Sequence, residues 1–424
     1  MRRRLFLGSL ATLGASPCLA FAQSASRAAK LTIRDVQIWR YSGQRAAEDF
    51  ALQWQVSPFS IYQRAESNPS APVPAPGSRV RQQALYLKLI TEPGLEGFYG
   101  AVDEEAAIVI ARQLKRLIIG QDALAGEILW DKMYRWNRHS RGGHYMMALS
   151  AVDNAVWDLR GKYFGVPVYR LLGGPSAPEI EAYASCLGFP SASEELNKRS
   201  AALKAEGYRH QKWFFSEGPA QGTAGLLRNV ALVRNLREAL GEEYEIMFDA
   251  YNGWNVEYAI AWARQVEKYR PGWIEEIVQS DKIEAFRQLK SQTSIPVATG
   301  EHFYGRWEVH EFLRAGAIDV IQADPEWCGG VSELVKICTL ASLHDLHVVP
   351  HGHNIHAALH VVASQSPMTC PLVEYLVNFK PHKAFFEKQP LIPVRGKIRL
   401  PDRPGFGIEL DQAKIEQSEQ VWAS

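Results

Sequence analysis

From Phe248 to Tyr375 the sequence alternates short apolar runs with segments of helical spacing. Each apolar run ends in ionisable residues, and the runs read FDAYN, WIEE, ATGEH, IQADP, VVPHGH and LVEY. The repeat is about 25 residues long, which is the length of one strand, one helix and two short loops. Such a repeat gives parallel strands with covering helices. The pattern predicts a (β/α) barrel, in which chemistry lies at the rim formed by the carboxyl ends of the strands.

The same repeat is predicted to begin further upstream. Glu181–Ser185 and His210–Phe215 carry strand patterns, and Glu194–Glu206 has helical spacing between them. The preceding segment is of another kind, because Lys30–Ile38 and Ala84–Ile90 alternate like strands of a sheet with one buried face.

Helices are predicted between these two regions. Asp103 is placed to cap a helix that has Glu104 and Glu105 in its first turn and ends at Gly120. The chain is therefore expected to contain an α+β capping domain at residues 30–150, with a long Pro-rich and aromatic loop at 42–80, a barrel at 151–385, and a segment at 386–424 that returns to the cap. Lys397–Leu400 and Gly407–Leu410 are expected to be strands of that returning segment.

Three acids recur at equal intervals at predicted strand ends, namely Asp249, Glu275 and Glu301. Buried together, they would repel one another, and a hard divalent cation relieves that repulsion. Ligation by oxygen alone suits Mg²⁺. The alternatives are three unrelated surface acids, or Glu276 in place of Glu275, because strand alternation lets only one of the two point fully inward.

His351 occupies the same register further along and is the candidate general base. Asp324, one predicted strand earlier, is expected to bind the other ring nitrogen of His351 and to fix its tautomer. A metal beside an oriented histidine indicates abstraction of a proton next to a carboxylate.

These residues together resemble the mandelate racemase subgroup of the enolase superfamily, over nearly the whole chain after Lys30. The segment ALSAVDNAVWDLRGKYFGVPVYRLLGG matches the subgroup's signature before the barrel, and KWFFSEGPAQG, GEHFYGRWE and ADPEWCGGVSELVKI resemble its rhamnonate dehydratase-like branch. The resemblance implies a modified TIM-type (β/α)7β barrel, Mg²⁺ on Asp249, Glu275 and Glu301, and Glu374 as the acid that contacts the substrate. It also implies that the long loop closes over the barrel mouth, and that the protein is a homo-oligomer.

One position departs from the pattern of many relatives. They carry Lys-x-Lys on the second barrel strand, whereas this chain has Lys212-Trp213-Phe214. Racemisation needs bases on both faces of the carbon, so the departure favours a reaction with a single base. Lys212 is a candidate for contact with the substrate, with a structural ion pair inside the barrel as the alternative.

Other polar residues near the strand ends are candidates for substrate binding, each with packing or an ordinary loop position as the alternative: Asn252, His302, His353 and Trp54, with Gln53 and Tyr62 also on the long loop. His356 and His360 have a spacing that can bind zinc. A zinc hydrolase of barrel type would also need His-x-His on the first strand, which is absent here. Both histidines are therefore predicted to be packing or surface residues.

The first residues, MRRRLFLGSLATLGASPCLAFAQSA, are typical of a secretory signal peptide at residues 1–22. Arg3 and Arg4 before Leu5 favour twin-arginine export. An exported or periplasmic protein is expected, and an ordinary secretory signal or an uncleaved anchor are the alternatives. No later stretch is long and apolar enough to span a bilayer.

Composition adds two constraints. The formal net charge is +1, which gives no nucleic-acid footprint. Four cysteines lie beyond the signal segment without metal-site spacing, and they are predicted to be buried free thiols, with disulfides as the alternative: Cys186, Cys328, Cys338 and Cys370.

Three functions fit these observations. The leading one is Mg²⁺-dependent dehydration of a sugar acid to a 2-keto-3-deoxy acid. A cycloisomerase or epimerase would share the same enolate, and a periplasmic sugar-acid binding protein would have lost the chemistry altogether.

Overall fold

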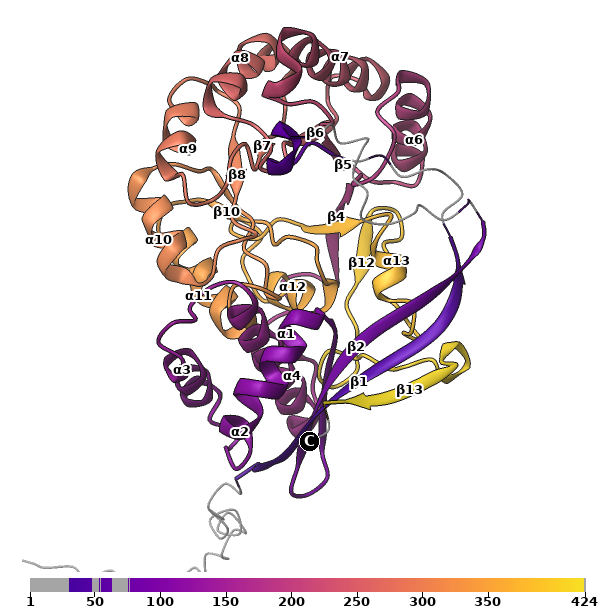
Figure 1. Cartoon of the computed structure of the whole chain (residues 1–424), viewed down its shortest axis with the longest axis vertical. Helices are drawn as coiled ribbons and strands as arrows, with labels where there is room; N and C mark the ends of the chain where they lie inside the picture. Colours follow the sequence, from indigo (N-terminus) through magenta and orange to yellow (C-terminus); the bar gives the residue numbers. More distant parts are fainter. Residues whose placement is uncertain (1–29, 48–52, 54, 63–74, 76, 423–424) are drawn as a thin grey trace, which may run out of the picture.

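The computed structural model describes residues 30–47, 53, 55–62, 75 and 77–422. The predicted signal peptide and Trp54 lie outside these residues. Figure 1 shows two parts, a barrel whose strands are ringed by helices and a capping sheet with its own helices at the opposite end of the molecule. Among the described residues no helix is both long enough and apolar enough to cross a membrane.

The capping sheet is antiparallel, and its order is β13-β1-β2-β3. Its strands are β1 (Ile33–Ala46), β2 (Arg79–Thr91), β3 (Glu96–Val102) and β13 (Gln417–Val421). The helix predicted after Asp103 is present as α1 (Glu104–Val109), a π-helical turn (Ile110–Leu114) and α2 (Lys115–Ile118). It is followed by α3 (Gly126–Trp136) and the long α4 (His144–Phe164), which packs on β3.

The barrel has eight parallel strands and seven helices between them, as the (β/α)7β prediction required. The strands are β4 (Glu179–Ser185), β5 (His210–Phe214), β6 (Glu245–Asp249), β7 (Ile274–Glu275), β8 (Val297–Thr299), β9 (Val320–Ile321), β10 (His347–Val348) and β11 (Val373–Leu376). The helices are α6 (Ser193–Ala205), α7 (Gly222–Leu240), α8 (Val256–Val266), α9 (Ile283–Lys290), α10 (Arg306–Ala315), α11 (Gly330–Ser342) and α12 (Ile355–Val362).

The register of the parallel strands explains why their ends form one rim. Asp249 pairs with Glu275, and Glu275 with Ala298, so successive strands end at the same level. Below this level the barrel is closed by a buried apolar layer that includes Tyr183, Met247 and Trp273. The interior is therefore apolar at one end and ionisable at the other.

Three details of the structure differ from the expectations drawn from the sequence. The division at residue 150 falls inside α4, and the chain reaches its first barrel strand only at Glu179, after α5 (Val168–Leu171). β12 (Lys397–Arg399) was expected in the cap, but it pairs antiparallel with β4 of the barrel. Gly407–Leu410 forms no strand, although Leu410 makes an isolated bridge to Glu387. The return to the cap is made by β13, which pairs with β1.

Candidate active site

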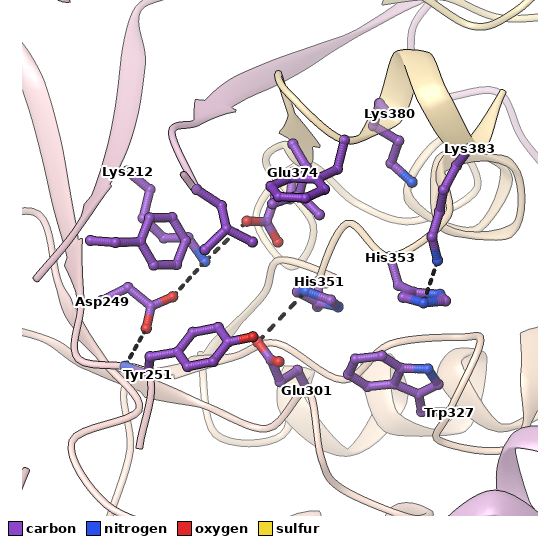
Figure 2. Close-up of a pocket in the computed structure, with 14 residues that line it drawn as sticks. Lys212, Asp249, Tyr251, Glu301, Trp327, His351, His353, Glu374, Lys380 and Lys383 are labelled. Carbon is purple, nitrogen blue, oxygen red and sulfur yellow. Dashed lines mark hydrogen bonds and ion pairs between the residues drawn. The ribbon is translucent and has the colours of Figure 1, made fainter. Parts of the chain in front are cut away.

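A cavity of about 190 Å³ opens at the carboxyl ends of the barrel strands. Figure 2 shows its ionisable side chains converging from several strands. Six of the candidate site residues named from the sequence line it: Lys212, Asp249, Glu301, His351, His353 and Glu374. The periodic acids and the histidine are thus brought to one place, as the repeat predicted.

The contact predicted between His351 and Asp324 is confirmed. Nδ1 of His351 lies 2.7 Å from Oδ2 of Asp324, and both residues are buried. Nε2 of His351 lies 3.7 Å from Oε2 of Glu301. Burial lowers the pKa of His351, but Glu301 and Asp324 outweigh it and raise that pKa to about 9. With Nδ1 bound to Asp324, Nε2 is the ring nitrogen that is turned to the acidic side of the cavity.

Lys212 lies at the centre of a buried charge cluster on β5. Its Nζ is 3.1 Å from Asp249 Oδ2, 2.5 Å from Glu275 Oε1 and 3.0 Å from Glu374 Oε1. Its side chain is 1 % exposed. Burial lowers the pKa of Lys212, but the three carboxylates raise it well above its usual range, so the group is an ammonium. The structural ion pairs offered as the alternative for Lys212 are present, and because its side chain also lines the cavity, contact with the substrate stays a prediction.

Glu275 and Glu276 point in different directions. Glu275 accepts from Lys212 through Oε1, and from Trp273 Nε1 at 2.9 Å through Oε2. Burial raises the pKa of Glu275 to about 8 despite the neighbouring ammonium. The other acid, Glu276, forms a group with Glu301 and His302 in which one ligand atom from each residue lies within 4.8 Å of the others. Oε1 of Glu276 is buried without a hydrogen-bond partner.

The acids on this side of the cavity carry more negative charge than the protein neutralises. Five acids are buried here: Asp249, Glu275, Glu276, Glu301 and Glu374. The ammonium of Lys212 contacts only three of them, Asp249, Glu275 and Glu374. Burial and the neighbouring carboxylates raise the pKa values of Glu276 and Glu301 well above their usual range. A cation with oxygen ligands would restore the ordinary ionised state of these acids.

Glu374 is held ionised on β11. Its Oε2 accepts from the backbone N of Gly352 at 2.8 Å, and its Oε1 faces Lys212. Burial raises the pKa of Glu374, but Lys212 and His351 hold it at about 2. This carboxylate is therefore an acceptor of hydrogen bonds and cannot donate a proton near neutral pH.

Asn252 and His302, named as candidates for substrate binding, are turned mainly toward the acids. Nδ2 of Asn252 donates to Glu276 Oε2 at 2.7 Å. His302 lies 3.4 Å from Glu301 and stacks on Trp327 with ring centroids 5.3 Å apart. Burial and the neighbouring His351 lower the pKa of His302 to about 4, so the imidazole is neutral near pH 7.

His353 lines the cavity on the side opposite the acids. Its Nε2 contacts Lys383 and lies 3.2 Å from Asp103 Oδ1. Burial and Lys383 lower the pKa of His353 to about 4. Asp103 was predicted as a helix cap and stands at that position, but its carboxylate makes no capping hydrogen bond and points to His353.

The long loop is described only in part, and that part lies against the rim. The backbone of Val56 donates to Phe215 O at 2.8 Å, and Gln53 Nε2 donates to Ser191 at 2.9 Å. Gln53 and Tyr62 do not line the cavity, and Tyr62 is 76 % exposed.

Several cavity residues were missed by the sequence patterns, namely Tyr251, Trp327, Lys380 and Lys383. Lys380 and Lys383 follow β11, so the position after a strand end was a signal that could have found them.

The other assignments of histidine and cysteine are confirmed. His356 is buried and its Nε2 lies 2.8 Å from Glu387, while His360 is buried and its Nδ1 accepts from the backbone of Tyr169 at 3.1 Å. All four described cysteines are buried free thiols.

Comparison with known families agrees with the fold and the rim. Residues 60–173 match the mandelate racemase / muconate lactonizing enzyme N-terminal domain, and residues 195–414 match the enolase C-terminal domain-like family. The chain is an enzyme of the enolase superfamily and belongs to its mandelate racemase / muconate lactonizing enzyme subgroup.

Named relatives lie within this subgroup. The chain is 34 % identical over 320 residues to an L-rhamnonate dehydratase of Saccharopolyspora erythraea, covering 73 % of this chain and 78 % of the relative. It is 33 % identical over 314 residues to a D-galactarolactone cycloisomerase of Agrobacterium fabrum, covering 71 % and 81 %. A solved rhamnonate dehydratase from Gibberella zeae, complexed with Mg, superposes with a TM-score of 0.79 at 27 % identity, covering 91 % of this chain and 95 % of that one.

Proposed function

We propose that the protein dehydrates a sugar acid to a 2-keto-3-deoxy acid with Mg²⁺ as cofactor. The observation that carries this proposal is the His351–Asp324 pair, whose free Nε2 is turned to the acid cluster. Similarity to two rhamnonate dehydratases, one of them solved with Mg, supports both the reaction class and the metal.

The acids at the rim fit a divalent cation. Glu276 has a buried oxygen without a hydrogen-bond partner, and its carboxylate converges with that of Glu301. We propose that Asp249 and Glu301 hold Mg²⁺ together with one of the two adjacent acids, Glu275 or Glu276. When bound, the cation polarises the substrate carboxylate and stabilises the negative charge that develops on it.

The side chains of the cavity provide the proton transfers. Glu301 is the main group that raises the pKa of His351, so a cation held by Glu301 would lower that pKa and leave Nε2 able to accept a proton. His351 Nε2 then takes the proton from the carbon next to the carboxylate, and Asp324 stabilises the imidazolium that forms. The imidazolium then donates that proton to the leaving β-hydroxyl, so one residue serves both steps. On β5 the second lysine of the Lys-x-Lys pattern is replaced by Phe214, whose ring lines the cavity and carries no base.

A cycloisomerase reaction is the second candidate, and similarity to the D-galactarolactone cycloisomerase favours it. It would begin with the same proton abstraction by His351. Incubation in D₂O separates the two reactions, because an isomerised product that carries deuterium without loss of water supports cycloisomerisation. A periplasmic binding protein without chemistry would bind sugar acids equally well with His351 replaced.

The first test is a panel of sugar acids incubated with the full chain and Mg²⁺. We expect at least one acid to give a 2-keto-3-deoxy product, detected with semicarbazide and by mass loss of one water. Removal of the metal with EDTA is expected to abolish turnover, and added Mg²⁺ is expected to restore it. Failure to turn over any hydroxy acid would contradict the proposed function.

The two adjacent acids give a matched pair of variants. The proposed Mg²⁺ site takes either Glu275 or Glu276 as its third ligand. Glu275 accepts hydrogen bonds from Lys212 and Trp273, whereas one carboxylate oxygen of Glu276 has no hydrogen-bond partner. We expect Glu276→Gln to weaken Mg²⁺ binding by about 10- to 100-fold, and Glu275→Gln to weaken it less. Calorimetric titration with MgCl₂ measures both. The reverse order would assign the ligand to Glu275, as the repeat in the sequence predicted.

A further inference from the structure

Lys380 is a buried cation that the proposed reaction does not use. It begins α13 (Lys380–Lys383), a single turn that follows β11, and it lines the cavity beside Lys383. The residue is 3 % exposed, and its Nζ has no hydrogen-bond partner among the described residues. A buried ammonium without a partner is costly, which makes this position unusual for a residue with no role.

The acids whose charge acts on Lys380 are committed to other donors. Asp324 binds His351 through Oδ2 and accepts from the backbone N of Glu326 at 2.6 Å through Oδ1. Glu326 is bound by the hydroxyl of Tyr99, and Glu374 by Lys212 and Gly352. These carboxylates influence Lys380 through space, but none of them accepts a hydrogen bond from it.

Lys383 adds a second positive group on the same side of the cavity. It contacts His353 and lies 3.9 Å from Asp103 Oδ1, so its place is fixed. Burial and the neighbouring Lys383 lower the pKa of Lys380 to about 7. An anion bound between them would raise that pKa again, because an opposite charge favours the ammonium form.

The two ends of the cavity therefore carry charged side chains of opposite sign. In Figure 2, Asp249 and Glu301 lie at one end, Lys380 and Lys383 lie at the other, and His351 lies between them. A sugar acid whose first carboxylate is placed at the acid and metal end, with its α-carbon at His351, extends its far carbons toward the two lysines.

We propose that Lys380, supported by Lys383, forms an anion-binding subsite for a second carboxylate at the far end of the substrate, so that the preferred substrate is a sugar diacid. This inference rests on the proposed function and narrows its substrate class. The ligand supplies the acceptor that Lys380 lacks, and the ion pair forms in a site from which water is largely excluded.

The test uses pairs of acids that differ only at the last carbon, galactonate with galactarate and gluconate with glucarate. The first of each pair ends in a primary alcohol and the second in a carboxylate. With the full chain and Mg²⁺, we expect kcat/KM to favour the diacid of a pair by about 100-fold. Equal values for both members of each pair would overturn the subsite.

Variants of Lys380 identify the source of this preference. Lys380→Met is expected to raise KM for the diacid by about 100-fold with little change in kcat, and Lys380→Arg is expected to retain most of the preference. Lys388→Met is the control, because Lys388 is an exposed lysine that pairs with Glu409 outside the cavity. Retention of the full preference in Lys380→Met would overturn the proposal.

Two further measurements separate this subsite from a structural role and from the reaction itself. Lys380→Met should melt at or above the temperature of the wild type, because it removes a buried charge that has no partner. A lower melting temperature would identify a structural cation and overturn the assignment. Calorimetric binding of galactonate and galactarate decides the subsite even if neither acid is turned over, and equal affinity of galactarate for wild type and Lys380→Met would refute it.

Discussion

Replacement of His351 by Asn is expected to lower kcat for dehydration by about 10³-fold and to change KM only slightly. The substitution removes Nε2, the one ring nitrogen not bound to Asp324, and with it both the base for the α-proton and the acid for the hydroxyl. The rate of 2-keto-3-deoxy acid formation measures the effect. Exchange of the α-proton in D₂O, followed by NMR, measures the abstraction step by itself.

Two further variants serve as comparisons for His351→Asn. Asp324→Asn keeps the base but removes the carboxylate 2.7 Å from Nδ1, so we expect a smaller loss, of about 10²-fold, with slower exchange of the α-proton. His344→Asn makes the same change at an exposed histidine and should retain full activity. If His351→Asn exchanged the α-proton as fast as the wild type, the base would have to be another residue.

The barrel and its dyad could be predicted because they depend on period and polarity. A repeat of one strand and one helix fixes which residues follow strand ends, and parallel strands in register bring those ends to one rim. Asp249 and Glu275 share a register pair, and Asp324 meets His351, without any information about side-chain conformation.

The direction of individual side chains at the rim could not be predicted in this way. Glu276 has a positive φ of 46°, which turns its side chain out of the alternation that the strand pattern assumes. Its carboxylate therefore meets Glu301 and His302, while Glu275 meets Lys212. Alternation along a strand predicts that only one of two adjacent residues faces inward, and it does not apply where the strand has ended.

The residues on the lysine side of the cavity could not be predicted, because they do not belong to the repeat in the sequence. α13 follows the last barrel strand, so no later segment repeats its spacing. Asp103 contacts His353 and Lys383 from the capping domain, far from both in sequence, and was recognised only as a helix cap. β12 was misplaced for a related reason, since a short alternating segment does not reveal which sheet it joins.

Replacement of Lys212 by Met is expected to destabilise the fold by about 3–5 kcal/mol, in addition to lowering activity by at least about 10²-fold. The change leaves Asp249, Glu275 and Glu374 buried without the ammonium that contacts all three. In a chain of this length that loss corresponds to a fall in Tm of about 5 °C, measured by calorimetry with EDTA present. Lys198→Met, at a position 75 % exposed, should leave Tm unchanged.

A double variant distinguishes lost charge balance from lost packing. Glu374→Gln removes one of the carboxylates that Lys212 neutralises, so Lys212→Met with Glu374→Gln should be more stable than Lys212→Met alone. If Lys212→Met destabilised the fold through poor packing of the methionine, adding Glu374→Gln would lower the stability further. An increase in stability would show that the interior of the barrel is held by charge compensation. The same deficit of positive charge is what the proposed Mg²⁺ relieves when it binds at the rim.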